Sequence, residues 1–359
     1  MIEFWRAGGG GDSTFPEAAV LAEAEGWDGQ MFMDSECIGA DPYVLMGAWA
    51  KLTQHMKLST GVTNPISRHP VVTASAAASV QAISGGRAVL GIGRGDSALA
   101  YLGQAPARLG LFEKCLTDLQ TLLSGGAISF GGYATAGETR SVDEISLGDR
   151  PAASRLQWLP PEMPKVPLDV AATGPKVIAM SARIAERVTF SVGAIAERID
   201  WALGIARQAQ AEHGRAVSYG AQIIVVCDTD VEKAMAWAMG AAAPLARFQV
   251  MEGQTAGPES GSDELNFAAL GTSYDMTKHG EIHATNKLVG KSLSPDFVKR
   301  FAIVGPPNHC SERLLELVKC GLERFVVVGP GFYPEPTGSR GGLFASEVMP
   351  AVRAAVDGG

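Results

Sequence analysis

Short runs of apolar and β-branched residues alternate with longer segments of helical period along most of this 359-residue chain. Eight such runs predict eight strands, and a predicted helix follows each of them. Eight strand–helix units favour a closed (β/α)8 barrel, the TIM barrel of the α/β class, over an open doubly wound sheet. The predicted strands are Ile2–Arg6, Gly29–Met33, Lys57–Val62, Ala88–Ile92, Leu168–Ala172, Val188–Ser191, Ala221–Cys227 and Arg324–Val328.

The segments between the strands carry helix boundary signals. Several begin at a proline, whose missing N–H costs nothing in the first turn of a helix, and three are followed by glycines placed as C-terminal caps. The predicted helices are Pro16–Glu25, Pro42–Thr53, Pro70–Ile83, Pro106–Leu123, Pro175–Glu186, Ala194–His213, Val231–Met239 and Leu343–Ala355.

Two long segments interrupt this rhythm within what we expect to be a single barrel domain covering residues 1–359. Residues 127–167 and 251–307 are rich in glycine and proline and lack the regular alternation. Loops this long in a compact barrel are often lids or binding walls, although solvated decoration of the surface is an equal alternative.

Composition narrows the possible partners and compartment. Thirty basic against 38 acidic side chains give a formal charge of −8, which argues against a nucleic-acid partner bound by phosphate neutralisation. Five cysteines without a CxxC pair favour a reducing compartment. The chain shows no signal-peptide pattern and no apolar run of membrane-spanning length, so we expect a cytoplasmic protein without a membrane partner.

Glycine recurs at the carboxyl ends of the predicted strands, where a barrel carries its active site. The third strand runs into Gly61-Val62-Thr63-Asn64, the fourth into Gly93-Arg94-Gly95-Asp96, and the fifth into Thr173-Gly174-Pro175-Lys176. Because glycine has no Cβ, these turns allow a flat or phosphorylated ligand to approach the backbone. Glycine-rich turns are also common in barrels that bind nothing there.

The turn after the fifth strand opens a helix and offers a possible phosphate seat. Free N–H groups and the positive end of the helix dipole attract an anion, and Lys176 adds a charge. Simple capping of the helix by Thr173 explains the same residues equally well.

Three carboxylates are candidates for acid–base work. Alternation places Glu3 on the same face of the first strand as Trp5, and a position inside the barrel would raise the pKa of Glu3. A solvent-exposed Glu3 at the barrel edge is the alternative. Asp34 and Asp96, at the ends of the second and fourth strands, would add two carboxylates to the same cavity.

Several other chemistries lack their motifs. Asp96 occupies the position of the third glycine in a dinucleotide fingerprint, and neither a P-loop nor a GxSxG elbow occurs. His279, Glu281 and His283 do not form the HExxH pattern of a helical zinc site, so we expect no metal.

Four stretches together resemble the bacterial luciferase-like superfamily of flavin- and deazaflavin-dependent oxidoreductases. They are residues 60–70 (TGVTNPISRHP), 84–97 (SGGRAVLGIGRGDS), 172–176 (ATGPK) and 301–305 (FAIVG). The resemblance extends over about residues 1–355. The pattern is most similar to the methylenetetrahydromethanopterin reductase branch, which uses the deazaflavin coenzyme F-420.

The resemblance implies a barrel with a cofactor ring at the strand carboxyl ends and assigns expected roles to residues. A non-prolyl cis peptide between Gly61 and Val62 would back the ring, and Asp34, Thr63 and Asn64 would contact it. Glu3 and Asp96 match acidic active-site positions. The remaining expected cofactor contacts are Gly95, together with Gly174, Pro175 and Lys176 near the cofactor phosphate.

Two departures argue against sugar-phosphate oxidation. Sugar-phosphate dehydrogenases of the family carry a histidine where this chain has Ser35, and their basic residue after the sixth strand has no counterpart in residues 191–195.

The main functional hypothesis is hydride transfer between coenzyme F-420 and a small organic substrate. An FMN-dependent monooxygenase supplied with reduced flavin by a partner reductase is the first alternative, and a catalytically silent cofactor-binding barrel is the second. The resemblance also implies a homodimer or higher homo-oligomer.

Overall fold

A computed structural model describes residues 1–8, 15–133, 141–251, 255, 257–259, 263–279, 293–329 and 341–358. Eight parallel strands close into a ring in the order β1-β2-β3-β4-β7-β8-β9-β11, with β11 paired to β1. The predicted (β/α)8 barrel is confirmed. Its strands are β1 (Glu3–Gly8), β2 (Gly29–Phe32), β3 (Lys57–Thr60), β4 (Ala88–Ile92), β7 (Leu168–Ala172), β8 (Arg187–Phe190), β9 (Ser218–Cys227) and β11 (Arg324–Val328).

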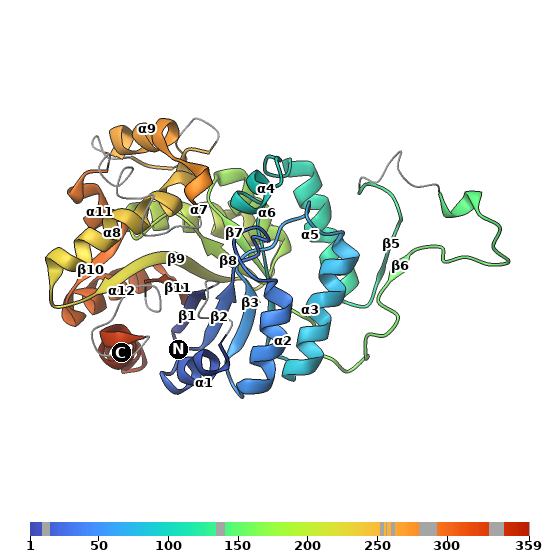
Figure 1. The fold of residues 1–359 in the computed structure, drawn as a ribbon, viewed down its shortest axis with the longest axis horizontal. Helices are drawn as coiled ribbons and strands as arrows, with labels where there is room; N and C mark the ends of the chain where they lie inside the picture. The colour runs from blue at the N-terminus through green and yellow to red at the C-terminus, as the bar shows by residue number, and fades with distance from the viewer. Residues whose placement is uncertain are drawn as a thin grey trace.

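Helices surround this ring, as Figure 1 shows. Among the described residues, none of the helices has the length and apolar character needed to cross a membrane. The helices that follow the barrel strands are α1 (Pro16–Ala24), α2 (Pro42–Leu52), α3 (Pro70–Ser84), α4 (Ser97–Tyr101), α5 (Leu109–Leu123), α6 (Pro175–Ile184), α7 (Ala196–Ala211), α8 (Val231–Ala246), α12 (Pro307–Cys320), the π-helical turn η6 (Phe344–Val348) and α13 (Met349–Asp357).

Local sequence signals explain where several helices begin and end. Pro42 opens α2, and the Asp41 carboxylate accepts hydrogen bonds from the Tyr43 and Val44 N–H groups at its start. Gly85 ends α3 in the left-handed conformation, with φ of 65°. The predicted helix over 106–123 is wrong in its first turn, because the chain forms the short α4 earlier and then starts α5 only at Leu109.

The first irregular segment forms a short antiparallel pair between β5 (Ala127–Ile128) and β6 (Ser154–Arg155). Figure 1 shows this segment extending away from the barrel beside α5. The 3-10 turn η2 (Val142–Glu144) lies within it.

The second irregular segment lies beside α8, and part of it falls outside the described residues. It contains a strand that the sequence analysis did not predict, β10 (Ile303–Gly305), which pairs with residues 225–227 of the long strand β9. The 3-10 turn η3 (Arg247–Gln249) precedes this segment. The other described elements within it are α9 (Asp263–Ser273), η4 (Met276–Lys278) and α11 (Pro295–Phe301).

The barrel interior is filled in layers by alternate residues of the strands. Trp5, Met31, Val89 and Val326 form an apolar layer across the middle. A Cβ at Gly29 would lie 2.4 Å from the Trp5 ring, so the glycine gives the indole its space. The middle of the barrel is therefore a packed core.

A charged layer closes the amino-terminal end of the barrel. Glu3 accepts hydrogen bonds from Lys57 at 2.5 Å and Arg187 at 2.8 Å, and Asp169 lies 3.1 Å from Arg324. Lys57, Arg187 and Arg324 are the first residues of their strands, so Glu3 lies at the end of the barrel opposite the strand carboxyl ends.

The predicted rise in the pKa of Glu3 is wrong. Burial on its own would raise the pKa, but the two adjacent cations outweigh it and lower the pKa from 4.5 to about 2. Glu3 lies inside the barrel as expected, but its neighbours there are cations. It also lies at the amino-terminal end of the barrel and not at the carboxyl ends of the strands, where the active site was expected.

The substitution Glu3→Gln should therefore lower the free energy of unfolding at pH 7 by about 3 kcal/mol, which is the free-energy equivalent of the shift in the pKa of Glu3. A carboxylate whose pKa is lowered on folding stabilises the folded state at pH values above its unfolded-state pKa, which is near 4.5. This contribution decreases as the pH falls toward 2. Urea unfolding should show the difference between Glu3→Gln and the parent shrinking from pH 7 to pH 3. Glu17→Gln on exposed α1 is the matched control, and an equal difference at both pH values would contradict this account.

Candidate active site

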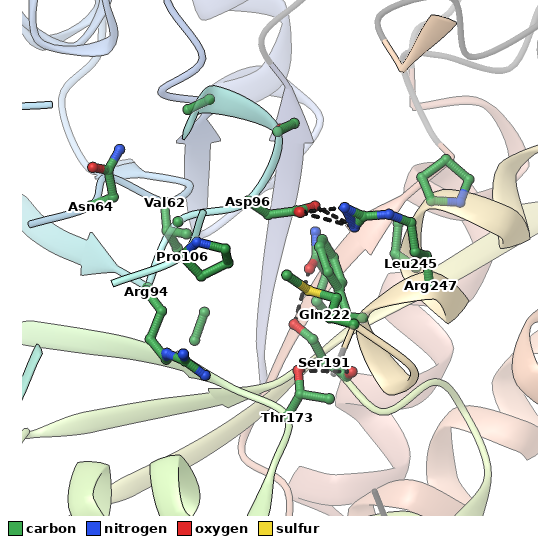
Figure 2. A pocket seen from close by; sticks show the side chains of 18 of the residues that line it. Val62, Asn64, Arg94, Asp96, Pro106, Thr173, Ser191, Gln222, Leu245 and Arg247 are labelled. Carbon is green, nitrogen blue, oxygen red and sulfur yellow. Dashed lines mark hydrogen bonds and ion pairs between the residues drawn. The ribbon is translucent and has the colours of Figure 1, made fainter. Parts of the chain in front are cut away.

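A cavity of about 1240 Å³ opens at the carboxyl ends of the barrel strands. One wall comes from the turns after β2, β3, β4 and β7, and the other wall comes from the end of α8, η3 and the region of α9. Figure 2 shows Asp96 on the first wall and Arg247 on the second. The predicted site residues that line this cavity are Asp34, Gly61, Val62, Asn64, Gly95, Asp96, Gly174, Pro175 and Lys176.

The turn after β3 forms a flat bed with few side chains. The Gly61–Val62 peptide is cis, which confirms that expectation. A Cβ at Gly93 would lie 3.1 Å from Val62 Cγ2, and Gly95 has φ of +92° with no room for a Cβ beside Leu99. Glycine thus keeps side-chain atoms out of this wall of the cavity on both turns.

Asp34 closes one edge of the bed. Its side chain is fully buried, and one carboxylate oxygen accepts a hydrogen bond from Arg68. Burial raises the pKa of Asp34, although the Thr63 hydroxyl and Arg68 both favour the charged form. Asp34 Oδ1, Thr63 Oγ1 and the Tyr43 hydroxyl are buried together at this corner.

Arg68 holds this corner together from the outside. It binds Asp41 at 2.8 Å and lies 3.6 Å from Glu36, while its guanidinium lies over the Tyr43 ring. Arg68 thus engages Asp34 Oδ2, while the Thr63 hydroxyl faces the same buried carboxylate.

Two predicted residues have structural roles at the bed. Asn64 lines the cavity, and its Oδ1 accepts hydrogen bonds from the Ile66 and Ser67 N–H groups, both at 2.9 Å. Thr63 is fully buried and is not among the lining residues.

Asp96 reaches across the cavity to Arg247, a residue that the sequence analysis missed. The Arg247 guanidinium donates three hydrogen bonds to the Asp96 carboxylate at 2.5–2.9 Å (Figure 2). Burial raises the pKa of Asp96, and Arg247 opposes that effect. This ion pair joins the β4 turn to η3, so it connects the two walls.

A hydrogen-bonded chain supports the floor. Buried Arg198 donates to Gln249 Oε1 at 2.6 Å, and Gln249 Nε2 donates to the Ser191 carbonyl at 2.5 Å. Ser191 Oγ in turn donates to Gln222 Oε1 at 3.2 Å, which leaves the Gln222 amide group toward the cavity (Figure 2). The sequence analysis did not predict these hydrogen bonds, because the bonded residues are 31 to 58 positions apart in the sequence.

Tyr274 and His279 lie on the wall formed by the second irregular segment. The Tyr274 hydroxyl and His279 Nδ1 share a hydrogen bond, and the Arg247 guanidinium lies over the Tyr274 ring at 5.0 Å. Burial, with Arg247 nearby, lowers the pKa of His279 to about 4. The other two members of the weak metal pattern, Glu281 and His283, lie outside the described residues.

The turn after β7 presents the start of α6 to the cavity. Gly174 precedes the helix, and a Cβ there would meet no atom within 4 Å, so the approach to the first-turn N–H groups is open. Lys176 is exposed at this edge. Thr173 does not cap the helix with its side chain, so helix capping by Thr173 does not explain this motif.

Glu3 does not join these residues, because it lies at the amino-terminal end of β1 and is not among the residues that line the cavity. Within the described part of the chain, no group of three histidine, cysteine or acidic side chains is placed to hold a metal ion.

Gly95→Ala should destabilise the fold by about 2 kcal/mol or more, because the new Cβ meets Leu99 Cδ1 at 2.4 Å and the backbone has a positive φ. Gly103→Ala is the matched control, since it has φ of +71° but nothing within 4 Å of the added Cβ. Thermal unfolding of both variants separates the clash from the backbone strain. Equal losses in the two variants would mean that the close approach to Leu99 carries no cost.

Comparison with known proteins relates this architecture to a family. The family model described as luciferase-like monooxygenase matches residues 8–324. A 5,10-methylenetetrahydromethanopterin reductase of Archaeoglobus fulgidus is 27% identical over 351 residues, covering 93% of this chain and 94% of that protein.

Solved structures share the fold at lower identity. The coenzyme F-420-dependent tetrahydromethanopterin reductase of Methanopyrus kandleri has a TM-score of 0.73 at 20% identity, covering 97% of this chain and 99% of the other. The oxygenating constituent of 3,6-diketocamphane monooxygenase from Pseudomonas putida, in complex with FMN, has a TM-score of 0.63 at 17% identity, covering 98% and 99%. The chain thus belongs to the luciferase-like monooxygenase family, a family of oxidoreductases.

Proposed function

We propose that this protein transfers a hydride between coenzyme F-420 and a small organic substrate. The observation that carries the proposal is the flat bed of Gly61, Val62 and Gly93 at the barrel mouth, beside the buried Asp34 carboxylate. The similarity to the Archaeoglobus fulgidus reductase across nearly the whole chain supports it.

The residues present suit a planar, anionic cofactor. The cavity of about 1240 Å³ exceeds the range of roughly 300–1000 Å³ of most ligand sites, which leaves room for a cofactor and a substrate together. The open start of α6 suits a phosphate.

The protein's own residues would bind and orient the cofactor, while the deazaflavin supplies the hydride chemistry. Asp34 and the bed around Asn64 hold the ring, Gln222 offers an amide donor from the floor, and Gly174, Pro175 and Lys176 receive the anionic chain. Asp96 stays a candidate acidic group, and its pairing with Arg247 also positions the opposite wall. Glu3 has no part in this scheme.

Titration of the purified protein with oxidised F-420 and with FMN tests the choice of cofactor. We expect saturable quenching of F-420 fluorescence and weaker binding of FMN. Tighter binding of FMN, together with oxygen consumption in the presence of reduced FMN, would instead support the monooxygenase and its partner reductase. Absence of binding by either cofactor would contradict both proposals.

Lys176→Ala should raise the Kd for F-420 by about tenfold at low salt, the equivalent of about 1.4 kcal/mol. The loss should shrink as salt is added, because an exposed charge is screened. Lys51→Ala, at the last turn of α2, removes the same charge away from the cavity and is the control. If both variants bind F-420 like the parent, the start of α6 is not the phosphate seat.

A further inference from the structure

The ion pair between Asp96 and Arg247 is a polar contact that joins the two walls of the cavity. Asp96 follows β4 on the wall that carries the bed, whereas Arg247 is the first residue of η3 on the other wall. Figure 2 shows the two side chains pointing toward each other. Only 16% of the Arg247 side chain and 15% of the Asp96 side chain are exposed. Opposite charges at this burial are screened little by salt, so the contact constrains both residues.

The Asp96 side chain is not used for the structural task that its position suggests. Asp96 occupies the N-cap position of α4, where an aspartate usually accepts hydrogen bonds from the first turn, but its side chain does not cap this helix. The carboxylate instead lines the cavity and accepts three hydrogen bonds from the Arg247 guanidinium. Its orientation is therefore set from the other wall.

Arg247 is itself held in place by an anchored turn. Two positions later in η3, buried Gln249 accepts a hydrogen bond from Arg198 at 2.6 Å and donates one to the Ser191 carbonyl at 2.5 Å. These bonds tie η3 to α7 and to the end of β8. The Arg247 guanidinium also lies over the Tyr274 ring, 5.0 Å from its centroid. The turn therefore presents Arg247 to Asp96 in one orientation.

Arg247 is the cation that favours the charged form of Asp96. Burial raises the pKa of Asp96, and Arg247 opposes this rise. Burial also raises the pKa of Tyr274 and lowers that of His279, so both side chains are uncharged near pH 7. The titratable groups that face the pair or the Tyr274 ring come from several elements: Tyr101 in α4, Tyr274 and Asp275 after α9, and His279 after η4.

We propose that Arg247 is a positioning residue for the cavity acid Asp96, which it aims across the cavity and keeps in the proton-accepting form at neutral pH. This inference rests on the proposed function. There, a substrate oxidised by two electrons passes a hydride to the bound deazaflavin and also gives up a proton. An ionised carboxylate in the cavity can accept that proton and release it to solvent.

The first test follows the charge of Asp96 by carbon NMR of the full chain with carboxyl-labelled aspartate, assigned through Asp96→Asn. In Arg247→Met the titration midpoint of Asp96 should rise by about one pH unit or more, because the opposite charge is lost while burial remains. Arg247→Lys should give an intermediate midpoint, because it keeps the charge but lacks the planar fork of donors.

Arg108→Met is the matched control, since Arg108 is exposed and is not among the lining residues. It should leave the midpoint of Asp96 unchanged. The same midpoint in Arg247→Met as in the parent would overturn the proposal.

Chemical rescue separates the role of the guanidinium from an effect on the fold. Arg247→Gly leaves a gap between Asp96 and the Tyr274 ring, and millimolar methylguanidinium should return the Asp96 midpoint toward the parent value. Methylammonium, which carries the charge without the fork, should do so less well. Equal rescue by the two cations would show that charge alone matters and would contradict a positioning role.

Gln249→Met tests the anchor and leaves Arg247 in place. It should raise the Asp96 midpoint less than Arg247→Met does, because the pair is loosened and not removed. Thermal unfolding of each variant identifies any that does not fold, and Arg247→Lys with Gln249→Met then decides the question. Parent midpoints in both of these variants would also overturn the proposal.

The outcomes separate this inference from the proposed function. The titration needs no cofactor, so failure of the parent to bind F-420 would defeat the proposed function, while the midpoints still decide whether Arg247 controls Asp96. Binding of F-420 by a parent protein whose Asp96 is already protonated at pH 7 would defeat this inference alone.

Discussion

Closure of eight parallel strands into one ring is the constraint on which the rest of the structure depends. Closure brings all eight carboxyl ends to one rim, so residues far apart in sequence share one cavity. The approach of β3 to β4 is especially close, because a Cβ at Gly91 would lie 2.0 Å from the Thr60 carbonyl oxygen. The Thr60 hydroxyl donates to the Gly91 carbonyl at 2.6 Å. The flat bed begins directly after this contact.

Arginine–carboxylate pairs hold the polar interior at both ends of the barrel. Glu3 with Arg187 and Asp169 with Arg324 occupy the lower layers, and Asp96 with Arg247 spans the cavity. The desolvation cost of such pairs offsets much of their Coulomb attraction, so replacing both partners by well-packed apolar residues would cost little stability. What they do supply is geometry, because removal of either partner leaves a buried charge. The cavity is therefore bounded by groups that resist rearrangement.

Local sequence pattern predicted the barrel and its glycine-rich turns, whereas the cis peptide of the bed was expected only from the family resemblance. Strand and helix periodicity, proline at helix starts and glycine in turns are read within a few residues of one another, and each of the eight predicted strands overlaps a strand of the ring. The same logic placed Asp34, Asp96 and Lys176 at strand ends. It failed for Glu3, because alternation shows that a residue faces inward but not which cations lie beside it. Those cations, Lys57 and Arg187, come from two other strands.

The opposite wall could not be predicted because no periodic signal specifies it. Arg247 meets Asp96 across 151 residues, and β10 is only three residues long.

This division has a physical basis. The bed is built from backbone on the rim of the ring, where glycine and main-chain geometry leave few alternatives. The facing wall is built from side chains at the end of α8, in η3 and on the second irregular segment, which can change without disturbing the ring. A barrel of this kind can keep one cofactor surface while its substrate surface varies, and the substrate chemistry must therefore be sought in the inserted segment.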